Sequence, residues 1–397
     1  MFDDFESARM GHVAGLRRSG DAAGRVLTAA DFAGAAQEIA QWEGYRPTPL
    51  VELDALAGAL GLAKVLYKDE GPRFGLGSFK ALGGAYAALR VLQQEISQAL
   101  GRPVSPDDIR SGRHAELASR IVLVTATDGN HGRSLAWGCR RFGAPCRIYI
   151  HAEVSEARAE AMRALGADMV RIDGNYDDSV ALAREEADAN GWFVVSDTSW
   201  PGYTETPRDV MAGYGVMVKE VCDALDRPPT HAFLQAGVGG LAAAVAAGLR
   251  QQWGREAPRV VVVEPELAAC LFESARAGRM TCIRVEEETV MAGLSCGEPS
   301  GIAWEILVEE ASDFLTVPES FVGPATRLLA RPAGNDPKIE AGESAVAGLA
   351  ALVAGARNEE MRGALGLDAG SRVLLIGSEG VTDPEAYAAI MAAGSGA

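Results

Sequence analysis

From about residue 79 onward, short runs of β-branched residues alternate with longer segments that are amphipathic or rich in alanine. Parallel strands need long crossover connections, usually helices, so this alternation predicts parallel strands joined by helices. The sequence therefore predicts an α/β fold with mostly parallel sheets covered by helices on both faces. The predicted strands are Ile121–Thr125, Arg147–Ile150, Met169–Ile172, Trp192–Val195, His231–Leu234, Val260–Glu264 and Val373–Ile376.

The charge balance limits the classes of partner. The 397 residues carry 37 basic and 54 acidic side chains, a formal net charge of −17. Nucleic acids and anionic lipids both require a basic surface, so neither nucleic acid nor membrane is expected as a partner. The balance is compatible with a cationic small-molecule substrate, although net charge locates no site.

Location and redox state follow from local composition. The apolar run Ala345–Ala356 is shorter than the roughly 20 residues that span a bilayer, and the acidic start lacks the features of a signal peptide. We therefore expect a cytoplasmic protein. The six cysteines have no zinc-ligand spacing, so we expect no metal site and six buried thiols. Whether Cys270 pairs with Cys296 is open.

A glycine-rich turn follows the predicted strand His231–Leu234. Gly237, Gly239 and Gly240 lead directly into an alanine-rich helix, whose first N–H groups and partial positive charge suit a phosphate. The segment also matches the dinucleotide pattern G-x-G-x-x-A, with Glu264 at the end of the next strand as a candidate ribose ligand. A phosphate site, a dinucleotide site and a turn without a ligand all remain open here.

Two further segments carry candidate chemistry. Lys80 lies at the head of an apolar helix, where a lysine amine can have a lowered pKa and form a Schiff base; the alternative is an ordinary lysine extending into water. The segment Ile121–Trp137 predicts a strand, a polar turn and a helix. Its turn, from Gly129 to Gly132, offers backbone N–H groups to a carboxylate.

These segments resemble, in order, three motifs of the fold-type-II pyridoxal-phosphate enzymes, the group of tryptophan synthase β, the threonine and serine dehydratases and cysteine synthase. The motifs are Ser78-Phe79-Lys80, Asp-Gly-Asn-His-Gly at 128–132 and Gly237-Val-Gly-Gly. Segments 153–179 and 374–380 also resemble the family. The resemblance implies two domains: residues 1–92 plus 208–397 form a large cofactor-binding domain, and residues 93–207 form a small mobile one.

The resemblance also implies a role for each motif. Lys80 would hold pyridoxal 5'-phosphate as a Schiff base, and Ser378 would face the pyridine nitrogen. Asn130 would bond the 3-oxygen of the cofactor. The phosphate would be bound by the backbone N–H groups of Gly237, Val238, Gly239, Gly240 and Leu241. The substrate carboxylate would be bound by Thr127, Asp128, Gly129 and His131, with His131 acting mainly through its backbone.

Three features narrow the resemblance to members that release ammonia from 2,3-diaminopropionate. Dehydratases usually have serine where this chain has Asp128. The segments Ser196–Tyr203 and Met291–Pro299 resemble the corresponding segments of the members that act on 2,3-diaminopropionate. The pattern at the first segment is usually Asp-Thr-Ala-Trp-Glu-Gly-Tyr, so Ser199 and Pro201 are departures that affect the expected shape of the loop.

Two carboxylates suit a substrate with two ammonium groups. Asp128 and Asp197 could hold the β-ammonium, or each could accept the Cα proton, and bases on opposite faces would serve both D and L substrates. The alternatives are a helix N-cap for Asp128 and a turn-bonding role for Asp197. We expect a homodimeric ammonia-lyase, with Lys80, Asp128 and Asp197 catalytic, that yields pyruvate and ammonia. The alternatives are a serine or threonine dehydratase, another D/L-amino-acid lyase of this fold, and a dinucleotide-binding oxidoreductase.

Overall fold

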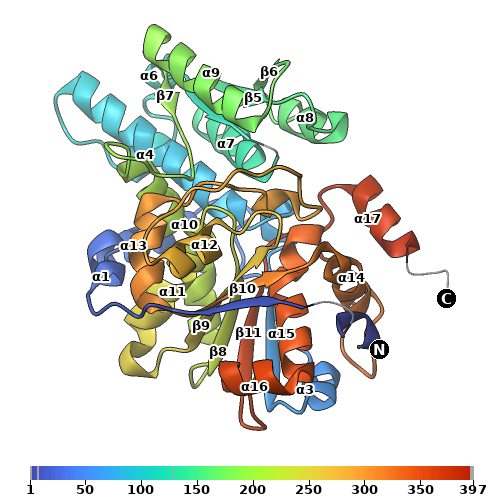
Figure 1. The fold of residues 1–397 in the computed structure, drawn as a ribbon. Helices are drawn as coiled ribbons and strands as arrows, with labels where there is room; N and C mark the ends of the chain where they lie inside the picture. Colours follow the sequence, from blue (N-terminus) through green and yellow to red (C-terminus); the bar gives the residue numbers. More distant parts are fainter. Residues whose placement is uncertain (1, 7–8, 128, 394–397) are drawn as a thin grey trace. The chain divides into compact units, whose positions relative to one another are not determined.

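The computed structural model describes residues 2–6, 9–127 and 129–393, and Figure 1 shows their course. The chain forms two compact units. Unit 1 comprises Met1–Ala29, Arg46–Ser78 and Met217–Ala397, and unit 2 comprises Ala30–Tyr45 and Phe79–Val216. The expected division at residues 92 and 207 differs from these units, because residues 30–45, 79–92 and 208–216 belong with unit 2.

Unit 1 is built on a seven-stranded sheet in the order β1-β10-β9-β8-β11-β3-β2. The two edge pairs, β1 with β10 and β2 with β3, are antiparallel, and the remaining pairs are parallel. The strands are β1 (Gly11–Ala14), β2 (Leu50–Glu52), β3 (Lys64–Asp69), β8 (His231–Gln235), β9 (Arg259–Pro265), β10 (Ala311–Val317) and β11 (Arg372–Gly377). The helices that belong wholly to this unit are α1 (Ala22–Val26), α3 (Asp54–Leu60), α11 (Gly240–Trp253), α12 (Cys270–Ala277), α13 (Gly301–Glu310), α14 (Val322–Ala330), α15 (Ala347–Arg357), α16 (Glu359–Leu365) and α17 (Pro384–Ala392).

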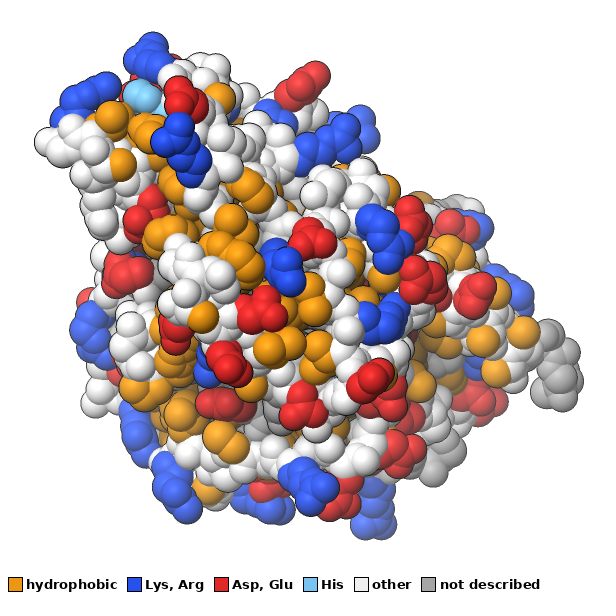
Figure 2. All heavy atoms as spheres, turned by 90° about the horizontal axis from the view of Figure 1, so that it is seen from above, with side chains coloured by type: hydrophobic (Ala, Val, Ile, Leu, Met, Phe, Trp, Pro, Cys, Tyr) orange, Lys and Arg blue, Asp and Glu red, His pale blue; other side chains and the backbone are white. Residues whose placement is uncertain are grey.

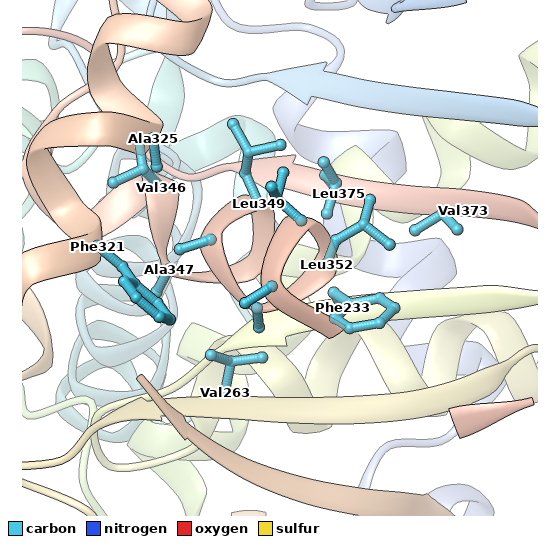
Figure 3. Packing of buried hydrophobic residues seen from close by; sticks show 14 of the residues in the cluster. Phe233, Val263, Phe321, Ala325, Val346, Ala347, Leu349, Leu352, Val373 and Leu375 are labelled. Carbon is cyan, nitrogen blue, oxygen red and sulfur yellow. The ribbon is translucent and has the colours of Figure 1, made fainter. Parts of the chain in front are cut away.

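Both faces of this sheet are buried. Phe233 and Val263 point to the face covered by α15, where they pack with Leu349 and Leu352 (Figure 3). The intervening residues of the same strands are buried as well, for example Leu234 at 0% exposure. Figure 1 shows α11 and α13 on one side of the sheet and α14 and α15 on the other. Burial on both faces explains why these strands read as continuous apolar runs.

Two strands of unit 1 carry buried charge and were not expected from the sequence. Asp313 of β10 is 0% exposed and accepts hydrogen bonds from the Arg259 side chain at 2.6 and 2.9 Å, with His12 Nε2 2.9 Å from its Oδ1. Lys68 of β3 is 1% exposed. Burial of a charged residue requires such partners, and the partners lie far away in the sequence.

A buried ionic cluster fixes the segment that leads out of β3. Lys68 Nζ lies 2.6 Å from Glu220 Oε2, while Arg73 binds Glu70 at 2.7 Å and Glu220 at 2.8 Å. Lys68 Nζ also donates to the Thr48 carbonyl at 2.8 Å. Burial by itself would raise the pKa of Glu220, but Arg73 and Lys68 outweigh it and the pKa is lowered. Two cations and two carboxylates therefore compensate one another inside unit 1.

We predict that Glu220→Gln lowers the free energy of unfolding by about 3–5 kcal/mol, because it leaves a buried cation uncompensated. Asp223→Asn is the matched control on the same helix, α10 (Glu205–Ala224), since Asp223 forms an exposed pair with Lys219. That control should cost less than about 1 kcal/mol. Urea unfolding of both variants measures the difference, and equal costs would contradict the prediction.

Unit 2 contains a four-stranded, entirely parallel sheet in the order β6-β5-β4-β7. Its strands are β4 (Leu123–Ala126), β5 (Cys146–Ile150), β6 (Asp168–Arg171) and β7 (Phe193–Val194). Its helices are α4 (Lys80–Leu100), α5 (Pro106–Arg110), α6 (Ala115–Ala118), α7 (Asn130–Phe142), α8 (Glu156–Arg163) and α9 (Tyr176–Asn190), with most of α2 (Ala29–Ile39) and the first part of α10. The seven predicted strands are all confirmed, with ends that differ by no more than two residues.

Small residues explain why α4 belongs to unit 2. A Cβ added at Gly83 would lie 2.4 Å from the Tyr214 ring, and one added at Gly84 would lie 2.7 Å from Ser134 Oγ. The Ala85 N–H also donates to Ser134 Oγ at 3.0 Å. Only glycine allows α4 to approach α10 and α7 this closely.

Figure 2 shows how charged side chains are distributed on one face of the molecule. On the face shown in Figure 2, acidic and basic side chains are interspersed rather than gathered into separate fields. Among the described residues, no helix is both long enough and apolar enough to cross a membrane.

Candidate active site

Lys80 is the first residue of α4, and its side chain is 21% exposed. The preceding Phe79 is buried and packs against the Tyr214 ring, with the centroids 4.6 Å apart. The Lys80 amine lies 5.6 Å from the Phe79 ring centroid. The Lys80 side chain therefore extends from apolar, aromatic surroundings, and its amine remains accessible to solvent. A residue that reacts with a small molecule needs such access.

Asp197 follows β7 and forms an ion pair with Lys80 through its Oδ2. Its side chain is 17% exposed. Burial alone would raise the pKa of Asp197, but the positive charge of Lys80, with smaller contributions from His131 and from hydrogen bonds to the carboxylate, together outweighs burial and holds this pKa well below its usual range. The carboxylate is therefore ionised at neutral pH and lies beside the lysine amine.

His131 contributes its side chain, which the sequence did not indicate. Its Nε2 lies 2.8 Å from the Val195 carbonyl, so this nitrogen carries the proton and donates it. Its Nδ1 lies 3.9 Å from Asp197 Oδ2. Burial lowers the pKa of His131 despite the nearby carboxylate, so the imidazole is neutral at neutral pH. The expectation that His131 acts mainly through its backbone therefore omits a side chain that lies beside Asp197.

Thr127 organises the turn before α7. Its hydroxyl accepts hydrogen bonds from the N–H groups of Gly129 at 3.1 Å and Gly132 at 3.3 Å. Asn130 is the first residue of α7 and is half-buried. Asp128 lies outside the described residues. A polar turn followed by a helix N-terminus is thus present between Thr127 and Gly132, as the sequence predicts.

The turn after Asp197 accommodates both departures from the family pattern. The N–H and carbonyl groups of Trp200 and Tyr203 bond to each other at 2.9 and 3.2 Å, and Gly202 has a φ of 86°. Pro201 thus occupies the second position of a turn and a left-handed glycine occupies the third, which is the arrangement of a type II turn. Ser199 is buried at 3% exposure. Pro201 therefore fits the loop.

In unit 1, the glycine turn after β8 presents N–H groups on one side. The Gly237 carbonyl accepts from the Cys270 thiol at 3.7 Å, and the Val238 carbonyl accepts from the Ser300 N–H at 2.9 Å. In a trans peptide the next N–H points the opposite way, so the N–H groups of Val238 and Gly239 face away from these partners. The first N–H groups of α11 have no partner within the helix. This turn therefore fits a phosphate group.

Ser378 lies directly after β11, next to the end of β8. Its Oγ accepts a hydrogen bond from Gln235 Nε2 at 2.8 Å, and the same nitrogen donates to the Ile376 carbonyl at 2.7 Å. Because the hydroxyl oxygen accepts this bond, its own proton remains available to another acceptor, such as a pyridine nitrogen. Sequence analysis identified Ser378 but missed Gln235, whose position depends on pairing between distant strands.

Glu264 does not act as a ribose ligand. It is 0% exposed, and its two oxygens accept hydrogen bonds from the N–H groups of Leu271 at 2.8 Å and Phe272 at 2.6 Å. Burial raises the pKa of Glu264 to about 8, with two N–H bonds opposing the shift. The carboxyl group therefore accepts the hydrogen bonds of N–H groups in the first turn of α12. It is not available to a ribose, so the feature that supported a dinucleotide site is lost.

The cysteines correct one expectation. None of the six, Cys270 and Cys296 included, forms a disulfide bond, but Cys282 is exposed and Cys222 and Cys296 are half-buried. The expectation of six buried thiols is therefore wrong for three of them. Cys282 lies in the segment between α12 and α13, where the structure has little regular secondary structure to cover it.

Comparisons with known proteins agree with this site. The family model for "pyridoxal-phosphate dependent enzyme" matches residues 41–379. Diaminopropionate ammonia-lyase of Escherichia coli strain K12 is 38% identical over 350 residues, which cover 87% of each chain. The solved structure of the Escherichia coli enzyme with an aminoacrylate-PLP azomethine reaction intermediate has a TM-score of 0.89, 34% identity and 98% coverage of both chains. A complex of that enzyme with D-serine has a TM-score of 0.88, 33% identity and 98% coverage of both chains.

The chain therefore belongs to the family of pyridoxal-phosphate dependent enzymes. The expected fold class and the expected cofactor, pyridoxal phosphate, are confirmed. Within that family the chain is similar along most of its length to diaminopropionate ammonia-lyases, as the sequence motifs predict. The membership excludes the oxidoreductase alternative.

The glycine turn allows a test of cofactor binding. Gly239 has a φ of +98°, and an added Cβ would lie 3.2 Å from the Leu271 side chain. Because a side chain in this conformation costs about 1–3 kcal/mol, we predict that Gly239→Ala weakens pyridoxal phosphate binding by about 5- to 150-fold. Absorbance titration with the cofactor measures this change. Gly363→Ala is the control, since a Cβ there would meet no atom within 4 Å. Unchanged affinity in Gly239→Ala would show that the turn does not hold the phosphate.

Proposed function

We propose that this chain catalyses α,β-elimination of 2,3-diaminopropionate. One substrate molecule and one water give one pyruvate and two molecules of ammonia. The observation that carries the proposal is the ionised Asp197, which is paired with the Lys80 amine and whose Oδ2 lies 3.9 Å from Nδ1 of the neutral His131. The similarity to diaminopropionate ammonia-lyase over 87% of each chain supports the same reaction.

Separate residues of this chain would bind separate parts of the cofactor. Lys80 would attach pyridoxal phosphate covalently and, once substrate has displaced it, carry protons. When bound, the cofactor supplies an electron-withdrawing ring that makes the Cα proton of the substrate acidic. The N–H groups from Gly237 to Leu241 would hold its phosphate, Asn130 its 3-oxygen and Ser378 its ring nitrogen. A hydroxyl opposite this nitrogen need not protonate the ring, which suits a reaction that passes its electrons on to a leaving group.

The substrate explains the acidic residues. 2,3-Diaminopropionate carries two ammonium groups, and ammonia leaves readily only from the protonated amine. Asp197 and Asp128 would orient the β-ammonium by charge-assisted hydrogen bonds, or accept the Cα proton from either face. The turn that contains Thr127, Gly129 and His131 would bind the substrate carboxylate at the N-terminus of α7. The Thr127 N–H donates to the Tyr149 carbonyl and the Gly129 N–H to Thr127 Oγ, so the His131 N–H would be the donor to the carboxylate among these three.

A serine or threonine dehydratase, or another D/L-amino-acid lyase of this fold, is the alternative. A specific observation favours keeping it, because the Escherichia coli relative has been solved in complex with D-serine. Serine carries a neutral hydroxyl as its leaving group, so it gains less from an acidic site than a β-ammonium does. The relative rates on the two substrates therefore distinguish the two functions.

The direct test incubates the purified protein and pyridoxal phosphate with D- and L-2,3-diaminopropionate, D- and L-serine and L-threonine. Pyruvate or 2-oxobutyrate is followed with ammonia. The proposal expects kcat/KM to be at least tenfold higher for one diaminopropionate enantiomer than for any hydroxy-amino acid. Faster release from serine or threonine would instead identify the alternative function.

We also propose that the enzyme is a cytoplasmic homodimer. The six cysteines form no disulfide bond, which supports a reducing compartment, and the fold-type-II resemblance supports the dimer. Cell fractionation and analytical ultracentrifugation test these two points separately.

A further inference from the structure

The backbone just before Asp197 is held by the hydroxyl group of Tyr203. This hydroxyl accepts a hydrogen bond from the Ser196 N–H at 3.1 Å and donates one to the Val194 carbonyl at 2.8 Å. It therefore bridges the two residues on either side of Val195. All these groups belong to unit 2, as do Lys80 and His131.

Val195 itself is held from two other directions. Its N–H donates to the Val124 carbonyl of β4 at 2.8 Å, and its carbonyl accepts from His131 Nε2 at 2.8 Å. Val195 is 0% exposed. On the far side of Asp197, the Thr198 N–H donates to Ser196 Oγ at 3.1 Å. The course of the chain into Asp197 is thus fixed by β4, His131 and Tyr203 together.

Tyr203 is itself supported by a stack. Its ring lies parallel to the Trp200 ring, with centroids 4.0 Å apart and an interplanar angle of 12°. The Arg184 guanidinium of α9 covers the Trp200 ring at 3.6 Å from its centroid. A cation over an indole ring is the strongest form of this interaction. The stack holds the Tyr203 ring and hence the position of its hydroxyl.

We propose that Tyr203 is a positioning residue for Asp197, and that Arg184 and Trp200 act through it. The hydroxyl bridge sets where the Asp197 carboxylate lies relative to Lys80 and His131. Misplacement of a reacting group by about 1 Å can cost 100-fold in rate, so a rigid support of this kind has a catalytic consequence. This role of Tyr203 adds a positioning residue to the proposed reaction. Only its kinetic test depends on the proposed function.

The first test is hydrogen exchange, which needs no turnover. In the full-length protein, Tyr203→Phe keeps the ring stack but leaves the Ser196 N–H and the Val194 carbonyl without their partner. We expect the Ser196 amide to exchange about tenfold faster or more, as for a backbone group that loses a buried bond. Tyr149→Phe is the matched control in the same unit, because it removes a hydroxyl bonded to Glu186. Equal exchange at Ser196 in wild type and Tyr203→Phe would overturn the proposal.

The second test is kinetic and uses the enzyme loaded with pyridoxal phosphate. We expect Tyr203→Phe to lower kcat about tenfold on the enantiomer that depends on Asp197, with KM little changed. In an Asp197→Asn background, Tyr203→Phe should cause no further loss, because a positioning residue has nothing left to position. Independent, multiplicative losses would overturn the proposal.

The two tests separate the possible failures. If the wild-type enzyme releases no pyruvate, the proposed function fails, and the exchange measurement alone decides the role of Tyr203. If Tyr203→Phe does not fold, Arg184→Gln provides the second variant, since it removes the support and leaves the hydroxyl. Arg184→Gln should raise the exchange of the Ser196 amide in the same direction, and an unchanged rate there would contradict the proposed stack.

Discussion

Lys80→Ala is expected to lower the rate of elimination by at least about 1,000-fold, because it removes both the covalent attachment of the cofactor and a proton carrier. The fold should survive, since the Lys80 side chain is 21% exposed and lies at the first position of α4. The change also removes the cation beside Asp197. Because burial still acts on that carboxyl group, its pKa should rise in the variant.

Borohydride reduction followed by mass spectrometry is the measurement that separates attachment from activity. Wild-type protein should carry the reduced cofactor on the peptide containing Lys80, and Lys80→Ala should carry none. Lys219→Ala is the matched control, because Lys219 is an exposed lysine paired with Asp223 on α10. Turnover by Lys80→Ala within tenfold of wild type, or a label on another lysine, would remove Lys80 from its assigned role.

The fold was largely predictable because its central strands are apolar on both faces. Runs such as Val260–Glu264 and Val373–Ile376 are recognisable without any knowledge of their neighbours, and both are strands. The strands β3 and β10 escaped prediction because Lys68 and Asp313 interrupt their apolar pattern. Their burial depends on Glu220, Arg259 and His12, partners that only the folded chain brings together.

The site was predictable where its chemistry depends on local motifs. Lys80 and the glycine turn follow from residues adjacent in the chain, because a helix start and a left-handed glycine are local features. The contributions of His131, Gln235 and Tyr203 were not predictable. His131 reaches a carbonyl 64 residues away and Gln235 a hydroxyl 143 residues away. Tyr203 is near Asp197 in sequence, but its hydrogen bonds depend on the turn that Pro201 and Gly202 form.

Asp197→Asn should keep the cofactor and lose about 100- to 10,000-fold in elimination, the usual contribution of a positioned acid or base. Asparagine has nearly the same shape as aspartate but cannot accept a proton or balance a β-ammonium charge. If two bases serve opposite faces, the loss should fall on one enantiomer of 2,3-diaminopropionate. Asp128→Asn should then impair the other enantiomer.

The pH dependence gives this prediction its sharpest form. With the Lys80 amine free, Lys80, His131 and hydrogen bonds together hold the pKa of Asp197 below its usual range against the effect of burial, so the carboxylate is ionised at neutral pH. If the carboxylate also stays ionised when Lys80 carries the cofactor, the loss caused by Asp197→Asn should be constant between about pH 6 and pH 9.

Steady-state rates on each enantiomer across that range measure the effect, with the cofactor absorbance recorded in parallel. Asp188→Asn is the control, because Asp188 is an exposed carboxylate on α9 in the same unit. A loss that disappears at one end of the pH range would show that Asp197 titrates during turnover. Unchanged rates on both enantiomers would show that the ion pair between Asp197 and Lys80 is structural, and would leave Asp128 and Lys80 as the groups that move protons.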